Sequence, residues 1–172
     1  MGKREMLDEI LAHAREQGLA NCSLREIADA IGSSHRMLLY HFGSRAGLLR
    51  EIVARNEAEE RAIAQAYAAE QLTPAEALAR TWQRLRKPSR AGEERLFFEL
   101  AAMALYRTPG TEAVADDMVD RWIALAGQAG VDVAPLRVDI AVIRGLLLDL
   151  LLTGDRKGTD AALRAYVDMR TA

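Results

Sequence analysis

Residues 32–49 read GSSHRMLLYHFGSRAGLL, and this stretch decides how the whole chain is interpreted. Gly32 can adopt the left-handed backbone of a tight turn, and Ser34 is a residue type that begins helices. Leu38 and Phe42 are four positions apart, so they lie on one side of a helix. The stretch therefore predicts a tight turn followed by a short helix with one apolar side.

The residues before this stretch predict two more helices. Residues 3 to about 16 repeat apolar side chains at helical spacing, and Gly18 follows as a helix-ending residue. Ser23 with Glu26 three positions later is the pattern of a capping box, so a second helix is expected from Ser23 to Gly32. Three short helices with a tight turn between the second and third are the components of a helix-turn-helix. A generic helical bundle has the same features, so these patterns alone leave both interpretations open.

The stretch also resembles the signature of the TetR family of transcriptional regulators. In that family a glycine turn leads into a short reading helix, a Tyr-His-Phe triplet, a Ser-Lys-like pair and a Leu-Leu pair. The matching residues here are Tyr40, His41, Phe42, Ser44, Leu48 and Leu49, and Arg45 stands where the family usually has lysine. The resemblance covers about residues 5–53, and it implies an N-terminal DNA-binding domain followed by a larger helical domain.

The reading helix departs from the family pattern at four positions. An apolar residue, a glycine, a threonine and the first tyrosine of a pair are replaced by Ser33, Arg36, Met37 and Leu39. These changes preserve the helical pattern but alter side chains that would meet DNA. A different operator is therefore expected, and one customary phosphate contact at position 39 is lost.

Side chains near the start of the third helix are expected to meet base edges in the major groove. Arg36 has paired donors that suit guanine, and a phosphate contact is its open alternative. Tyr40 and His41 are expected on phosphates, with a base as the second option for His41, and Arg45 is expected to hold a phosphate at a helix start. Ser23 would serve as a cap, a phosphate contact, or both. The expected DNA-binding residues are Ser23, Arg25, Ser33, Ser34, His35, Arg36, Met37, Tyr40, His41 and Arg45.

The remainder of the chain predicts further helices and no convincing strand. Their expected ranges are 45 to about 69, 73 to about 87, about 91 to 106, about 111 to 129, from beyond Pro135 to about 153, and 159–170. The predicted fold class is all-α with about nine helices. The expected domains are a helix-turn-helix domain at residues 1–46 and a helical ligand-binding and dimerisation domain at residues 47–172.

The last two expected helices have more apolar surface than one small domain can bury. A second copy would cover the excess as a four-helix bundle, and the family resemblance implies the same homodimer. Two reading helices would then lie roughly 34 Å apart on a roughly palindromic operator. The expected interface residues are Ile140, Ile143, Leu147, Leu150, Leu151, Leu163, Tyr166 and Val167.

The resemblance further implies a pocket for a small, mainly apolar effector within helices five to eight. Its expected lining residues are Trp82, Phe97, Phe98, Met103, Tyr106, Met118, Trp122 and Arg144. Aromatic and methionine side chains at helical spacing also form ordinary cores, which is the alternative for these residues. Arg144 is expected to pair with Asp139 or Asp149, or else to point into the pocket. Ligand binding is expected to weaken DNA binding, and repression is the family's usual effect.

Composition limits the other functions that the chain can have. Cys22 is the only cysteine among 172 residues, so an internal disulfide is excluded and neither a metal nor a cofactor is predicted. The three histidines all precede residue 42, and no phosphate-binding loop or nucleophile motif is present, so we do not expect an enzyme. Without a signal peptide or a membrane-spanning stretch, the protein is expected to be cytoplasmic. The remaining alternative is a helical protein-interaction module whose helix-turn-helix does not read DNA.

Overall fold

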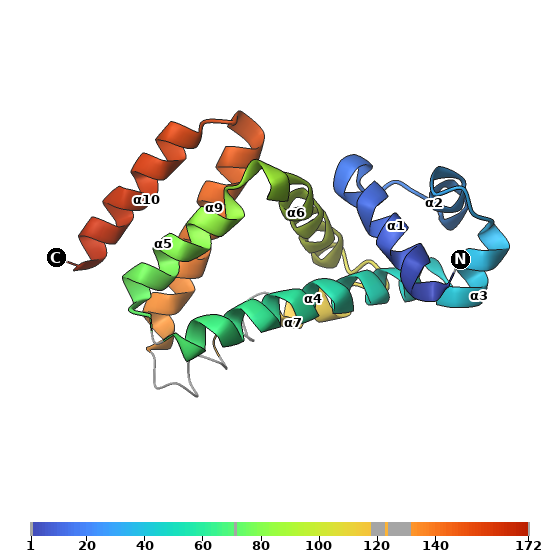
Figure 1. Cartoon of the computed structure of the whole chain (residues 1–172), viewed down its shortest axis with the longest axis horizontal. Helices are drawn as coiled ribbons and strands as arrows, with labels where there is room; N and C mark the ends of the chain where they lie inside the picture. The colour runs from blue at the N-terminus through green and yellow to red at the C-terminus, as the bar shows by residue number, and fades with distance from the viewer. Residues whose placement is uncertain (1, 71, 118–122, 124–131, 172) are drawn as a thin grey trace. The chain divides into compact units, whose positions relative to one another are not determined.

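The computed structural model describes residues 2–70, 72–117, 123 and 132–171, and these residues form helices without any strand (Figure 1). The helices are α1 Lys3–Gln17, α2 Leu24–Ala30, α3 His35–Phe42, α4 Arg45–Ala69, α5 Pro74–Leu85, the 3₁₀ turn η1 Pro88–Arg90, α6 Ala91–Leu105, α7 Glu112–Asp117, α9 Val133–Thr153 and α10 Arg156–Thr171. The predicted all-α fold class is therefore confirmed. Among the described residues, no helix is both long enough and apolar enough to cross a membrane.

Several predicted helix boundaries were wrong, and α2, expected to reach Gly32, ends at Ala30. Helix α5 ends at Leu85, two residues earlier than expected. Helix α9 begins at Val133 with Asp132 as its cap, so Pro135 lies in its first turn, where a missing N–H costs no helical hydrogen bond. Helix α10 begins at Arg156, because the Asp155 carboxylate accepts a hydrogen bond from a backbone N–H of the first turn. Most of the helix expected at 111–129 falls outside the described residues.

Backbone contacts divide the chain into two compact units, which we describe separately. The head unit comprises Met1–Arg61 and Gly92–Asp117, and the body unit comprises Ala62–Ala91 and Met118–Ala172. The predicted domain boundary after residue 46 falls inside α4, and it stays a prediction.

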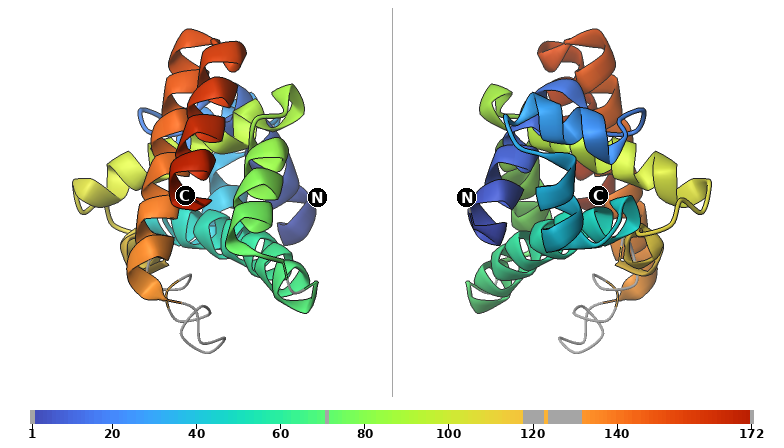
Figure 2. Two further views of the ribbon diagram at one scale, coloured as in Figure 1. Left: turned by 90° about the vertical axis from the view of Figure 1, so that its left-hand side faces the viewer. Right: turned by 90° about the vertical axis from the view of Figure 1, so that its right-hand side faces the viewer.

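The head unit is built around one apolar core, and its helices α1 to α3 face the viewer in the right-hand view of Figure 2. Helices α1 to α4 each contribute side chains that water barely reaches, and burying such a side chain stabilises the fold by about 1.5–3 kcal/mol. The most completely buried are Met6, Ile10, Leu19, Ile27, Ala28, Leu38, Leu48, Leu49 and Ile52. Because α3 is anchored in this core, its other side must face solvent.

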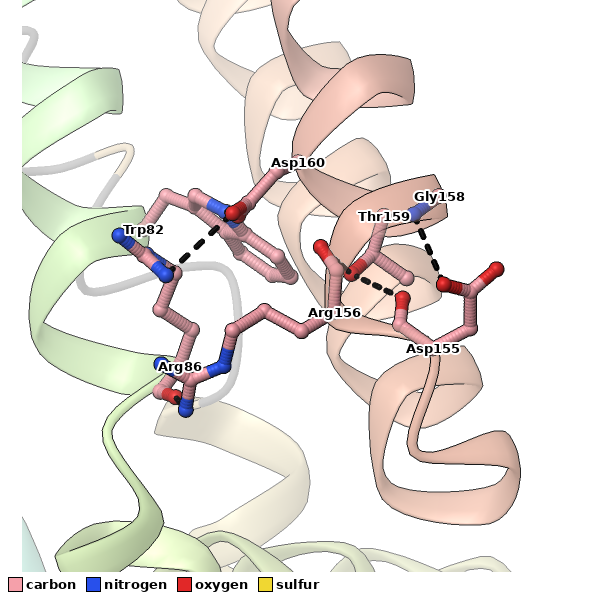
Figure 3. Close-up of polar contacts among 7 residues, drawn as sticks. All are labelled: Trp82, Arg86, Asp155, Arg156, Gly158, Thr159 and Asp160. Atoms are coloured by element: carbon pink, nitrogen blue, oxygen red, sulfur yellow. Dashed lines mark hydrogen bonds and ion pairs between the residues drawn. The ribbon is translucent and has the colours of Figure 1, made fainter.

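In the body unit, α9 packs against both α5 and α10, and α9 and α10 lie side by side in the left-hand view of Figure 2. A polar cluster joins α5 to the start of α10 (Figure 3). The indole N–H of Trp82 donates to Asp160 Oδ1 at 2.7 Å, and Arg86 Nη1 lies 3.3 Å from Asp160 Oδ2. Arg156 Nη2 donates to the Arg86 carbonyl at 2.8 Å. These bonds give the buried indole N–H an acceptor, and they hold the first turns of α10 against the end of α5.

Asp139 is a buried carboxylate in the body unit. Its Oδ1 accepts a hydrogen bond from the Tyr166 hydroxyl at 2.7 Å, and its Oδ2 lies 3.0 Å from Arg170 Nη1. Burial, with the hydrogen bond to Asp139, raises the pKa of Tyr166 to about 12. The phenol therefore stays protonated and able to donate at neutral pH. Asp139, one of the two expected partners of Arg144, is thus paired with α10.

Candidate DNA-binding interface

A short turn joins α2 to α3 and sets the angle between them. Gly32 has φ +65°, and the Ser33 N–H donates to the Ala28 carbonyl at 2.9 Å. Ser34 caps α3, with its hydroxyl accepting from the Met37 N–H at 3.2 Å. A residue with a Cβ would be strained at the positive φ of Gly32. The sequence therefore predicted this turn and this cap correctly.

Helix α3 has one buried and one exposed side. Leu38 is fully buried and Phe42 nearly so, whereas Tyr40 is 79% exposed. Of the residues predicted to contact DNA here, Ser34, His35, Arg36 and Met37 are exposed and Ser33 is half-buried. The first turn of α3 contains no acidic residue. An exposed face without acidic charge at the start of a reading helix suits a DNA groove.

Ser23 begins α2 with the predicted capping box. Its hydroxyl accepts from the Glu26 N–H at 3.3 Å, while its own N–H donates to Glu26 Oε2 at 2.7 Å. Hydrogen bonds from the side chain and then the backbone of Ser23 lower the pKa of Glu26. The cap is confirmed, and the phosphate contact of Ser23 stays a prediction. The neighbouring Arg25 is exposed.

His41 differs from its exposed neighbours. Its side chain is half-buried, and Nε2 is shielded from water without a hydrogen-bond partner among the described residues. Its ring lies edge-on to Tyr40, with the ring centroids 5.0 Å apart. The Nε2 atom therefore faces the protein, and the predicted DNA contact of His41 stays a prediction.

Arg45 has a structural role that sequence reasoning missed. Its Nε donates to the Cys22 carbonyl at 2.9 Å, and its Nη2 donates to the carbonyls of Leu19 and Ala20 at 2.8 and 3.0 Å. The guanidinium thus joins the start of α4 to the loop between α1 and α2. No local sequence pattern signals this contact, because the partners are backbone atoms more than twenty positions away. The predicted phosphate contact of Arg45 stays a prediction.

The family model of bacterial regulatory proteins of the tetR family matches residues 5–52, which include α1, α2, α3 and the start of α4. Residues 5–52 are therefore a DNA-binding domain of the TetR family. The protein is a DNA-binding transcriptional regulator. No curated protein matches the sequence.

A solved structure from Rhodococcus sp., assigned to the TetR-family transcriptional regulators, has a similar fold. The two structures superpose with a TM-score of 0.72 over 97% of each chain, at 20% sequence identity. At 20% sequence identity, this structural similarity establishes a shared fold and nothing further.

The eight residues predicted to line a ligand pocket fall in different parts of the chain. Trp82 and Met103 are buried, Phe97, Phe98 and Arg144 are half-buried, Tyr106 is 87% exposed, and Met118 and Trp122 lie outside the described residues. The Phe97 and Phe98 rings pack edge to face at 5.2 Å, and burial lowers the pKa of Arg144. The body unit also contains a cavity of about 410 Å³, lined by Thr73, Pro74, Ala75, Leu78, Val167 and Arg170. None of the six predicted residues that the structure describes lines that cavity.

The eight predicted interface residues are mostly engaged within the chain itself. Ile143, Leu147 and Leu163 are buried, and Ile140, Leu150, Leu151, Tyr166 and Val167 are half-buried. A different set of apolar side chains on α9 and α10 is exposed, namely Val138, Leu148, Leu152 and Met169. The predicted interface itself stays a prediction.

The contacts of Arg45 lead to a stability prediction. In Arg45→Lys the charge remains, but an ammonium cannot reproduce the fork that reaches three carbonyls. We expect the free energy of unfolding to fall by about 1–3 kcal/mol, measured by urea denaturation. The matched control is Arg4→Lys at an exposed position of α1. Wild-type stability in Arg45→Lys would contradict a structural role for the guanidinium.

Proposed function

We propose that this protein is a ligand-responsive repressor. It binds a roughly palindromic operator as a homodimer and is released by a small, mainly apolar ligand. The observation that carries the proposal is the two-sided character of α3, which buries Leu38 and Phe42 and exposes the side chains around Arg36. The alternative is a helical protein-interaction module, whose binding would not depend steeply on salt as DNA binding does.

The exposed start of α3 supports a base-reading role for Arg36. The guanidinium can donate two parallel hydrogen bonds to O6 and N7 of guanine, which is the commonest specific contact to a base. Ser34 and His35 precede Arg36 on the exposed first turn and would contact neighbouring bases or phosphates. Arg25 and Tyr40 are also exposed and would hold the phosphate backbone on either side.

An exposed stripe on α9 supports homodimerisation. Val138, Ala141, Gly145, Leu148 and Leu152 are all exposed and follow alternating steps of three and four residues, which is the spacing of a helix–helix seam. Nothing lies within 4 Å of a Cβ placed on Gly145, so another helix has room to approach there. On α10, Ala162, Ala165 and Met169 are exposed at the same kind of spacing. A second copy would cover both stripes as a four-helix bundle.

The cavity of the body unit supports a small ligand. Most of its wall is apolar, from Pro74, Ala75, Leu78 and Val167, and Arg170 adds one charge that is paired with Asp139. A ligand there would contact the start of α5 and the last turns of α10. Bound ligand would favour a dimer in which the spacing of the two reading helices does not match adjacent major grooves. Ligand and DNA would then each weaken the binding of the other.

The base-reading role of Arg36 is tested by selection of bound sequences from a random duplex pool. Wild-type protein is expected to enrich a palindrome. Arg36→Ala should lose discrimination at one symmetric pair of positions, at a cost of about 1–3 kcal/mol per base contact. Arg4→Ala, which removes an exposed arginine from α1, is the matched control and should keep the preference. No enrichment by the wild type, at low salt and without ligand, would argue for the interaction module.

The dimer surface is tested by placing a charge in the stripe of α9. We expect Leu148→Arg to sediment as a monomer, because a buried unpaired guanidinium is costly at a helix–helix seam. Leu105→Arg places the same side chain at an exposed apolar position of α6 and should remain dimeric. A dimeric Leu148→Arg protein, measured by sedimentation velocity, would rule out this stripe as the interface.

A further inference from the structure

The loop between α1 and α2, residues 18–22, is held by a carboxylate from α6. The backbone N–H of Leu19 donates to both carboxylate oxygens of Glu99, at 2.9 and 3.0 Å, and the N–H of Ala20 donates to Oε1 at 2.6 Å. Such charge-assisted bonds are about twice as strong as neutral ones. Glu99 is about eighty residues away in sequence, and it lies outside the segment 5–52 that matches the family domain.

The same loop is held through its carbonyl groups by Arg45. Glu99 binds N–H groups of the loop, while the Arg45 guanidinium binds the carbonyls of Leu19, Ala20 and Cys22. One charged side chain thus satisfies the donors and the other satisfies the acceptors. We call this pair of contacts the loop clamp.

The backbone of the loop is suited to the approach of α6. Gly18 has φ +78°, and a Cβ there would lie 2.9 Å from Glu99 Oε1. The positive φ favours glycine at this position, and a Cβ there would displace the carboxylate from its place beside the loop.

Within the head unit, α6 and the loop after it approach α1 and α4 at two further places. A Cβ on Gly92 would lie 2.7 Å from the Arg15 carbonyl oxygen at the end of α1. A Cβ on Gly110 would lie 2.3 Å from the Ala46 carbonyl oxygen at the start of α4. Gly92 and Gly110 thus allow the segment that contains them to pack its backbone directly against α1 and α4. Glu99 lies between these two glycines in the sequence. The position of the carboxylate is therefore defined by backbone contacts on both sides.

We propose that Glu99 is a positioning residue for DNA binding. The clamped loop leads directly into Ser23, the cap of α2, so its conformation sets where Ser23 and Arg25 meet the phosphate backbone. Without the charge of the carboxylate, the N–H groups of Leu19 and Ala20 keep at most a neutral, weaker acceptor and the entry into α2 is less ordered. This inference rests on the proposed phosphate contacts of Ser23 and Arg25.

Long-range electrostatics predicts the opposite change in DNA affinity, so the direction of that change tests the proposal. DNA is polyanionic, so removing any carboxylate from the head unit should by itself strengthen binding. A positioning role predicts instead that Glu99→Gln weakens binding. Glu16→Gln, at an exposed position of α1, makes the same change of charge and serves as the matched control.

The experiment uses the full-length protein and the duplex that the selection enriches. In Glu99→Gln we expect the amides of Leu19 and Ala20 to exchange hydrogen about tenfold faster than in wild type, and the operator Kd to rise by about tenfold. In Glu16→Gln the exchange should be unchanged and the affinity equal or higher. Glu99→Asp keeps the charge and shortens the side chain, so it should change exchange and affinity in the direction of Glu99→Gln. It also serves as the reporter if Glu99→Gln does not fold.

Two outcomes would overturn the positioning role: unchanged exchange of the two amides in both Glu99 variants, or operator affinity equal to or higher than that of the wild type. Failure of the proposed function gives a different result, because the wild type itself would then bind no duplex selectively. The exchange measurement needs no DNA, so it reports on the loop clamp in either case.

Discussion

Helix α3 has a single buried side, and the packing of Leu38 and Phe42 determines which side that is. A helix of eight residues anchored at these two positions must turn Arg36 and Tyr40 toward solvent. The tight turn at Gly32 and the cap at Ser34 then fix the angle at which α3 leaves α2. The exposed face of α3, which we propose reads DNA, is thus a consequence of how the head core packs.

The head unit extends beyond the segment that matches the family domain. Glu99 and Arg45 hold the loop before α2 from its N–H and its carbonyl sides, and within the head unit Gly92 of α6 and Gly110 beyond it approach α1 and α4 closely. A change at α6 would therefore reach the start of α2 through hydrogen bonds of defined geometry. This is the kind of connection through which a ligand-dependent regulator can alter its DNA affinity.

Sequence reasoning succeeded where the signal is local. The capping box at Ser23 and the turn at Gly32 are defined within four or five residues, and both were predicted correctly. It missed the roles of Glu99 and Arg45, because their partners are backbone atoms far away in sequence. Apolar periodicity also cannot distinguish burial within a chain from burial between chains, so Ile143 and Leu147 were assigned to an interface although they are buried in the body unit. Solvent exposure was needed to find the stripe from Val138 to Leu152.

The most direct test of the account maps operator binding onto the backbone by amide chemical shifts. When the protein is titrated with its selected duplex, the account predicts that the largest changes fall at residues 23–25 and 33–37, with smaller changes in the clamped loop 18–22. All of these chemical-shift changes should become smaller as the salt concentration rises, because phosphate contacts release counterions and DNA binding weakens. Changes confined to α9 and α10, with residues 23–37 unaffected at saturation, would contradict DNA binding through the exposed face of α3.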